Sequence, residues 1–144
     1  MKNSKGFSLL ELLIVVAIIL IIATIAIPSL LRSRQAANES AAVANLRTVN
    51  TAQVTYLSSS GGTYGLMTDL ITAKLLDDTF TNTKAGYNYT MTLDATFNDY
   101  TVVAEPAAAN SGRYGYYSTP DAVVRYSTTA SLAPTAAQAG RSVQ

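Results

Sequence analysis

The chain contains neither histidine nor cysteine. It therefore lacks the commonest general base, any thiol nucleophile and the ligands of most transition-metal sites. Its glycine cluster at residues 61–65 has no lysine and follows no predicted strand, which excludes a nucleotide-phosphate loop. From these absences we predict that the protein is not an enzyme and that it holds no cofactor or metal ion.

The lack of cysteine also excludes disulfide bonds. The chain has 144 residues, of which 49% are hydrophobic, and this is enough for one domain rather than two. An exported domain of this size without a disulfide must be held together by packing alone.

Charge is nearly absent between Phe7 and Pro28, where Glu11 is the only ionisable side chain among 22 residues. A helix of that length, at ~1.5 Å per residue, spans the roughly 30 Å hydrocarbon core of a bilayer. A carboxylate inside such a segment should cost on the order of 2.5–3.5 kcal/mol. Cleavage after Gly6 would offset this cost, because it creates an α-amino group on Phe7, close to Glu11.

The segment GFSLLELLIVVAII, followed by Ala26-Ile27-Pro28, resembles the class III signal sequence of type IV pilins and of the related pseudopilins. The resemblance implies that a membrane-embedded prepilin peptidase removes a leader of residues 1–6 by cutting between Gly6 and Phe7. It also implies that the same enzyme methylates the new N-terminal Phe7. Glu11 would then serve processing and assembly, and Pro28 would kink the helix.

The same resemblance implies partners and a location. The subunit would be stored in the bacterial inner membrane, meet an assembly platform there, and polymerise with identical copies into an extracellular helical pilus. In that filament Glu11 of one copy would pair with the amino group of Phe7 of an adjacent copy. Loss of the leader leaves eight basic side chains against nine acidic ones, so we expect no sequence-specific binding to nucleic acid.

Two features depart from the family pattern. Many type IV pilins close their C-terminal region with a disulfide, which this chain cannot form. Leu20 stands where such pilins commonly have a glycine. Relatives partly unwind their helix between that glycine and the proline in the assembled fibre, and we do not expect the same unwinding at residues 20–28 of this chain.

A conventional secretory signal and a plain membrane anchor both fit the N-terminal segment less well. The apolar core of a secretory signal has roughly 7–15 residues, which is shorter than this run. A plain anchor would explain the length and would place Lys2 and Lys5 on the cytoplasmic side. It would not explain a glutamate that follows a Gly-Phe pair.

After Pro28 the sequence stays helical in character but becomes amphipathic. We predict one nearly continuous helix from Phe7 to about Ser58, with a membrane-spanning half (7–28) and an amphipathic half (29–58). A core stripe is expected at Val43, Leu46 and Val49, and an exposed face at Arg34, Asn38, Asn45 and Thr48.

Residues 59–128 should form a globular head, beginning with a short helix around Leu66–Leu76. Alternating or strand-like patterns predict four strands, at Gly86–Leu93, Asp99–Ala104, Arg113–Ser118 and Val123–Thr128. The predicted fold class is α+β, a long N-terminal helix packed on an antiparallel sheet of three or four strands. The tail at 129–144 is rich in Ala, Ser and Thr, and we expect it to be mobile.

Two acidic segments are incomplete as cation sites. Asp77-Asp78 lacks the Asp-x-Asp-x-Asp-Gly series of a calcium loop and is interpreted as a solvated turn. Asp121 lies in a loop that resembles a calcium-binding loop of some pseudopilins, but further ligands are not evident in the sequence.

The leading hypothesis is a major type IV pilin whose fibre serves adhesion, twitching motility or DNA uptake. The alternative is the major pseudopilin of a type II secretion system, although only Thr63-Tyr64-Gly65-Leu66 and Leu70 echo its typical segment and tryptophan is absent. A bitopic membrane protein with a small binding head remains if the chain is never cut.

The nine tyrosines suggest a further hypothesis, that the fibre conducts electrons. No aromatic residue lies between Phe7 and Tyr56, which argues against stacking along a fibre core. The tyrosines expected to reach the surface of the head are Tyr114, Tyr116, Tyr117 and Tyr126.

Overall fold

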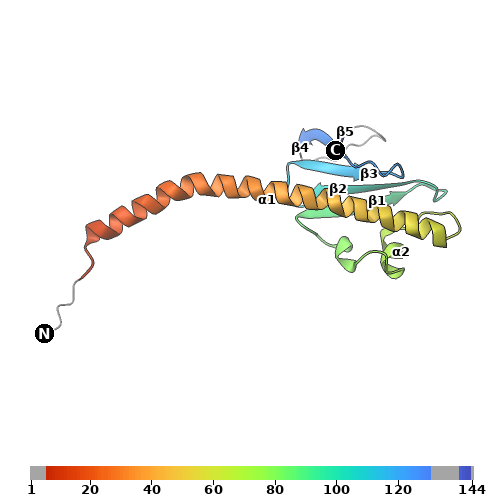
Figure 1. Ribbon diagram of the computed structural model, residues 1–144, viewed down its shortest axis with the longest axis horizontal. Helices are drawn as coiled ribbons and strands as arrows, with labels where there is room; N and C mark the ends of the chain where they lie inside the picture. The colour runs from red at the N-terminus through yellow and green to blue at the C-terminus, as the bar shows by residue number, and fades with distance from the viewer. Residues whose placement is uncertain (1–5, 131–139, 144) are drawn as a thin grey trace. The chain divides into compact units, whose positions relative to one another are not determined.

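The computed structural model describes residues 6–130 and 140–143. They form the predicted α+β fold, one long helix and an antiparallel sheet (Figure 1). The elements, in chain order, are α1 (Leu9–Ser59), α2 (Met67–Thr72), the 3-10 helix η1 (Asp78–Thr81), β1 (Tyr87–Leu93), β2 (Tyr100–Pro106), β3 (Tyr114–Ser118), β4 (Arg125–Ala130) and β5 (Arg141–Ser142).

The chain divides into two compact units between Ser33 and Arg34. The first unit contains the N-terminal half of α1, in which no described side chain is buried. α1 continues through Pro28, although proline removes one backbone hydrogen bond. The second unit, which we call the head, contains the C-terminal half of α1 and everything after it.

In the head, α1 buries a stripe at helical spacing. Its buried residues are Glu39, Ala42, Leu46, Val49, Asn50, Ala52 and Gln53, which confirms the predicted core positions 46 and 49. The predicted exposed face is wrong at Asn38 and Asn45, which are half-buried. Asn38 Nδ2 donates to the Ser111 carbonyl over 2.8 Å, and Asn45 Nδ2 donates to the Tyr89 hydroxyl over 2.9 Å. The hydropathy pattern predicts that polar amide side chains are exposed. These two lie beside the buried stripe, where groups of the head form hydrogen bonds with them.

The five strands pair with their sequence neighbours only, in the order β1-β2-β3-β4-β5, and every pairing is antiparallel. The predicted strands lie within two residues of the observed ones. The sheet exceeds the predicted three or four strands by β5, a two-residue strand from the predicted tail. A strand of two residues shows no periodicity in sequence, and only the pairing of Ser142 with Arg125 and of Arg141 with Tyr126 reveals it. The remainder of the predicted mobile tail, 131–139 and 144, lies outside the described residues.

The core lies between α1 and one face of the sheet, where α1 crosses it (Figure 1). Tyrosines fill much of this core, because β1 turns Tyr87 and Tyr89 inward as its alternation predicts. Tyr116 and Tyr117 are buried as well, contrary to the prediction that they reach the surface. Since successive strand residues alternate in direction, these two lie on opposite faces of the sheet, and neither face leaves them exposed. Tyr114 and Tyr126 are half-buried.

The predicted helix at 66–76 is shorter than expected. α2 ends at Thr72, and Lys74 follows with a left-handed φ of 60°. The chain closes there with a hydrogen bond of 2.9 Å from the Leu75 amide to the Leu70 carbonyl. A left-handed residue after the last turn is a common way for a helix to end.

Three polar connections attach α1 to distant parts of the head. The first joins Glu39 to Arg113, whose backbone amide, Nε and Nη2 donate to the carboxylate over 2.7, 3.1 and 2.9 Å. Burial tends to raise the pKa of Glu39, but the hydrogen bonds and charge of Arg113 outweigh it and hold that pKa below its ordinary value.

The other two connections are formed by buried amide side chains. Asn50 donates to the Ser118 hydroxyl over 2.8 Å and accepts from the Tyr100 hydroxyl over 3.0 Å. Gln53 bonds both backbone groups of Gly65, accepting over 3.1 Å and donating over 2.7 Å. Both amides therefore have partners for their donor and acceptor groups, as burial requires.

The turn between β1 and β2 is closed by hydrogen bonds and contains one left-handed residue. Asp94 Oδ1 accepts the amides of Asn98 and Asp99 over 2.8 and 3.0 Å, and the Phe97 carbonyl accepts the Tyr64 amide over 2.9 Å. Phe97 itself has a φ of 58°, in the left-handed region that favours glycine or asparagine. For a residue with a side chain this conformation costs about 1–2 kcal/mol.

Candidate processing and assembly site

The predicted cleavage site lies outside regular structure. Residues 6–8 precede α1 without helical conformation, and Phe7 exposes 82% of its surface. A Cβ built on Gly6 would meet no atom within 4 Å. The Gly6–Phe7 bond is therefore in accessible, irregular chain, the kind of segment that proteases cut.

The first turn of α1 carries a capping box formed by Ser8 and Glu11. The Leu10 amide donates to Ser8 Oγ over 3.3 Å, and the Ser8 amide donates to Glu11 Oε2 over 3.0 Å. The pair satisfies two amides that lack helical acceptors and holds the carboxylate at the positive end of the helix dipole. Glu11 thus has a partner within its own chain. Sequence reasoning overlooked this role, although Ser-x-x-Glu before an apolar run is its signature.

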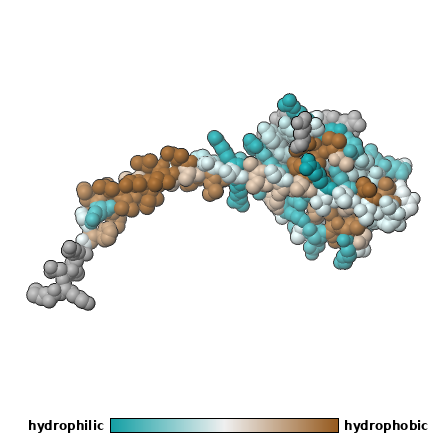
Figure 2. Space-filling view, viewed as in Figure 1, coloured by the Kyte–Doolittle hydropathy of each residue, from teal (hydrophilic) through white to brown (hydrophobic). Residues whose placement is uncertain are grey.

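The surface around Glu11 is apolar and uncovered. The large apolar side chains from Phe7 to Leu31 are all exposed, and Figure 2 shows the resulting hydrophobic surface along the N-terminal part of α1. Among the described residues, α1 is the one helix long and apolar enough to cross a membrane. An apolar surface of this extent on a folded chain marks a site that a membrane or another protein covers.

Pro28, the remaining predicted site residue, is separate from this N-terminal group. It follows Glu11 by 17 residues, which is roughly 26 Å along a helix. The structure thus brings Ser8 and Glu11 together, leaves Gly6 and Phe7 just before them, and places Pro28 well beyond them.

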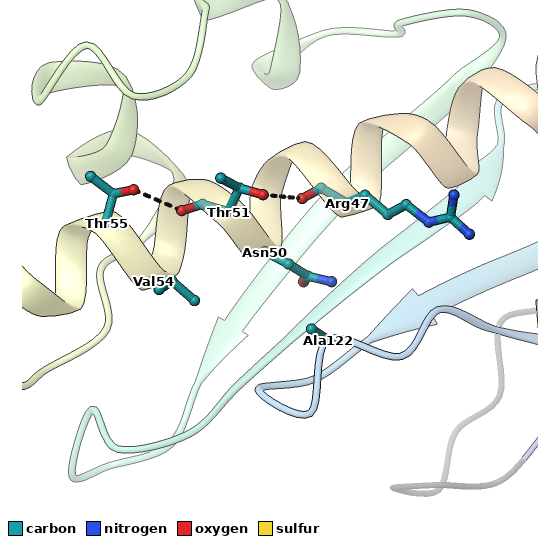
Figure 3. Close-up of a pocket in the computed structure, with 6 residues that line it drawn as sticks. All are labelled: Arg47, Asn50, Thr51, Val54, Thr55 and Ala122. Atoms are coloured by element: carbon teal, nitrogen blue, oxygen red, sulfur yellow. Dashed lines mark hydrogen bonds between the residues drawn. The ribbon is translucent and has the colours of Figure 1, made fainter.

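The head has a shallow hollow of about 360 Å³ beside α1 (Figure 3). The Thr51 and Thr55 hydroxyls donate to the carbonyls of Arg47 and Thr51 over 3.0 and 2.9 Å, so they are turned toward the helix backbone. Val54 on α1 and Ala122 on the opposite side of the hollow form the apolar part of its lining. The Arg47 guanidinium and the Asn50 amide complete the lining, so the hollow offers apolar contact beside one fixed positive charge.

The two acidic segments are engaged in local ion pairs. Asp77 lies 2.7 Å from Lys84 Nζ, and Asp121 lies 2.6 Å from Arg125 Nη2. Hydrogen bonds from these cations hold the pKa values of both carboxyl groups below the ordinary range. In the part of the chain that the structure describes, no cluster of three or more acidic side chains is placed to hold a metal ion.

Comparison with known proteins finds matches for this chain, one to the N-terminal segment alone and others that extend beyond it. A family model described as the prokaryotic N-terminal methylation motif matches residues 1–27. Over 130 residues the chain is 33% identical to the type IV wide pilus major component PilA4 of Thermus thermophilus, covering 90% of this chain and 92% of that protein. Over 56 residues it is 46% identical to the type IV major pilin protein PilA of Myxococcus xanthus, covering 39% of this chain and 26% of that protein.

The first of these similarities extends along nearly the whole of both proteins, well beyond the N-terminal motif. A shared leader and apolar helix cannot account for it, because the head must match as well. The chain belongs to the type IV pilin family.

Proposed function

We propose that the chain is a structural subunit of a type IV pilus. It enters the inner membrane as a prepilin, loses residues 1–6 by cleavage after Gly6, is N-methylated on Phe7 and polymerises into a helical filament. The filament would serve adhesion, twitching motility or DNA uptake. One observation carries this proposal: the uncovered apolar N-terminal half of α1 contains a single carboxylate, Glu11, four residues after an accessible Gly-Phe bond.

Assembly would exchange one apolar environment for another. The side chains from Phe7 to Leu31 face lipid in the stored subunit and face neighbouring helices in the filament, so the hydrophobic free energy changes little. Glu11 would favour the filament over the membrane, because in the filament a second copy places the amino group of its Phe7 beside the carboxylate. A desolvated pair of this kind sets the axial register between copies. Since the contact joins different surfaces of identical subunits, it propagates as a helix instead of closing.

Processing would precede this exchange. The chain itself gives no steric reason for a glycine at position 6, since a side chain there would meet nothing. We infer that the requirement for Gly6 comes from the prepilin peptidase. The capping box would persist after cleavage, because Ser8 and Glu11 both remain in the mature chain. The inner-membrane assembly platform is the second partner that this route requires.

The test is the N-terminal sequence and intact mass of the protein taken from its native host. We expect a chain that begins at N-methylated Phe7 and is recovered in long surface fibres at native expression. A protein that still begins at Met1 would overturn the proposal. Correct processing without long surface fibres would favour a pseudopilin of type II secretion.

A further inference from the structure

Large apolar side chains are rare on the surface of the head. Among the described residues after Leu31, three are exposed: Val54, Leu66 and Phe97. Val54 lies in the hollow beside α1, and Phe97 lies at the tip of the turn between β1 and β2. The head thus presents an apolar hollow at one place and an apolar projection at another.

Packing within the chain does not explain Phe97. Its backbone is held in a left-handed conformation that glycine or asparagine would adopt with less strain. Its carbonyl is fixed by the Tyr64 amide, whereas its side chain remains 49% exposed. The turn therefore places a phenylalanine that is only partly buried at a left-handed position. Strain of this kind, held by a rigid surrounding, is typical of functional positions.

The hollow has the chemistry to receive such a side chain. Thr51, Val54, Thr55 and Ala122 line it together with Arg47 and Asn50, and the amide of Asn50 is already bonded to Ser118 and Tyr100. The Asn50 amide would therefore keep its partners when an apolar group enters, and the exposed Arg47 side chain lies at the same hollow. An aromatic ring buries about 150–250 Å² when it is fully covered, which is a large share of a contact of this size.

We propose that Phe97 of one copy inserts into this hollow of the next copy and contacts Val54 and Ala122 there, beside Arg47. The proposal rests on the proposed function, because polymerisation brings heads together at high effective concentration. The occupant is a second copy because the same chain carries both the projection and the hollow. A contact between two different surfaces of one subunit repeats without closing, so it is compatible with a filament.

The absence of cysteine makes crosslinking the direct test. In filaments of the double variant Phe97→Cys and Val54→Cys, mild oxidation should produce a ladder of disulfide-linked multimers on a non-reducing gel. Each single variant should give no ladder. A matched control pairs Phe97→Cys with Glu105→Cys, an exposed position at the other end of the β1–β2 hairpin. We expect at least about tenfold more multimer from the first pair than from this control.

Equal multimer from both pairs, or intact filaments without a ladder, would overturn the contact and leave the pilus subunit assignment standing. Wild-type cells without surface fibres would instead remove the proposed function.

A second variant keeps the test decisive if the double-cysteine chain does not assemble. Phe97→Asn should lower the melting temperature of filaments by about 5 °C or more. It should leave the melting temperature of detergent-solubilised subunits unchanged or higher, since asparagine tolerates the left-handed backbone. Phe97→Tyr should restore filament stability. If Phe97 only stabilises its own head, Phe97→Asn should lower both melting temperatures equally. That result, or no change in either melting temperature, would refute the contact.

Discussion

The two halves of α1 share a backbone conformation but differ in where their apolar surface is removed from water. Before Arg34 no described side chain is buried, whereas seven helix residues are buried after it. The C-terminal half covers its apolar stripe with its own sheet. None of the described residues covers the N-terminal half, whose apolar surface would be removed from water by lipid or by other copies.

The polar bonds of the two halves differ in the same way. Near the N-terminus Glu11 bonds an amide three residues away. In the head, Gln53 and Glu39 reach partners 12 and 74 residues away. A segment with only local bonds can change its surroundings without breaking tertiary structure, whereas the long-range bonds hold α1 to the rest of the head.

The largest expected effect tests this contrast with two equivalent substitutions. Leu46→Ala should lower the free energy of unfolding by about 2.7–5 kcal/mol, because Leu46 is fully buried in the core. Leu20→Ala, at a position that is 60% exposed, should change it little. Thermal or denaturant unfolding of the full chain in detergent measures both. Similar losses of unfolding free energy from Leu46→Ala and Leu20→Ala would contradict the difference in burial between the two halves of α1.

Glu11→Gln should come next, and its effect should appear in assembly. It removes the charge that the Phe7 amino group would otherwise pair with, which costs at least about 2 kcal/mol per contact, or roughly 30-fold. We expect normal membrane insertion but little incorporation into fibres when native subunits compete. Glu105→Gln, an exposed carboxylate in β2, is the matched control and should assemble normally. Equal incorporation of Glu11→Gln and wild-type subunits would count against the pairing.

A smaller effect is expected from the ion pair between α1 and the head. Glu39→Gln should destabilise the head by about 1.5 kcal/mol, the lower part of the range for hydrogen bonds to charged groups, because solvent reaches Arg113. The lowered pKa of Glu39 makes this contribution pH-dependent. It is fully present above the unfolded-state pKa near 4.5 and is lost as the pH falls through the lower folded-state value.

Unfolding curves of wild type and Glu39→Gln should therefore differ at neutral pH and converge below about pH 4.5. Arg34→Gln, an exposed residue on the same helix, should leave the pH dependence unchanged. A constant difference between wild type and Glu39→Gln at all pH values would contradict the ionic nature of the bond.

The smallest effect concerns the capping box. Ser8→Ala removes the acceptor of the Leu10 amide and should destabilise the first turn by about 0.5–2 kcal/mol. The expected result is faster hydrogen exchange of the first few amides of α1 in detergent micelles, with no change in the head. Thr24→Ala, inside the same half of the helix, should leave those amides protected.

Much of this protein follows from local pattern. The apolar run with one glutamate predicts the membrane-spanning half, and strict alternation at 87–93 predicts β1 and its inward face. The prediction for β1 is confirmed, because hydrophobic periodicity reports directly on which side of a strand is covered, whereas the membrane span of residues 7–28 stays a prediction. The capping box was equally readable, since all four of its positions are adjacent in sequence.

Predictions failed where burial depends on distant partners. Asn38 and Asn45 are polar, but the sheet supplies acceptors and donors that bring them inside. Tyr117 is buried on the face of the sheet opposite Tyr116, and alternation cannot indicate that both faces of β3 are covered. The strand β5 exists only through its pairing with β4.

The sequence by itself determined an apolar N-terminal helical segment with one charge and an α+β head, because composition and period act over a few residues, and its first 28 residues carry the resemblance to type IV pilins. Tertiary structure alone decided which polar groups hold α1 to the sheet, where the hollow lies, and how Phe97 is presented. Those features join residues far apart in the chain, and only the folded backbone sets the distances between them.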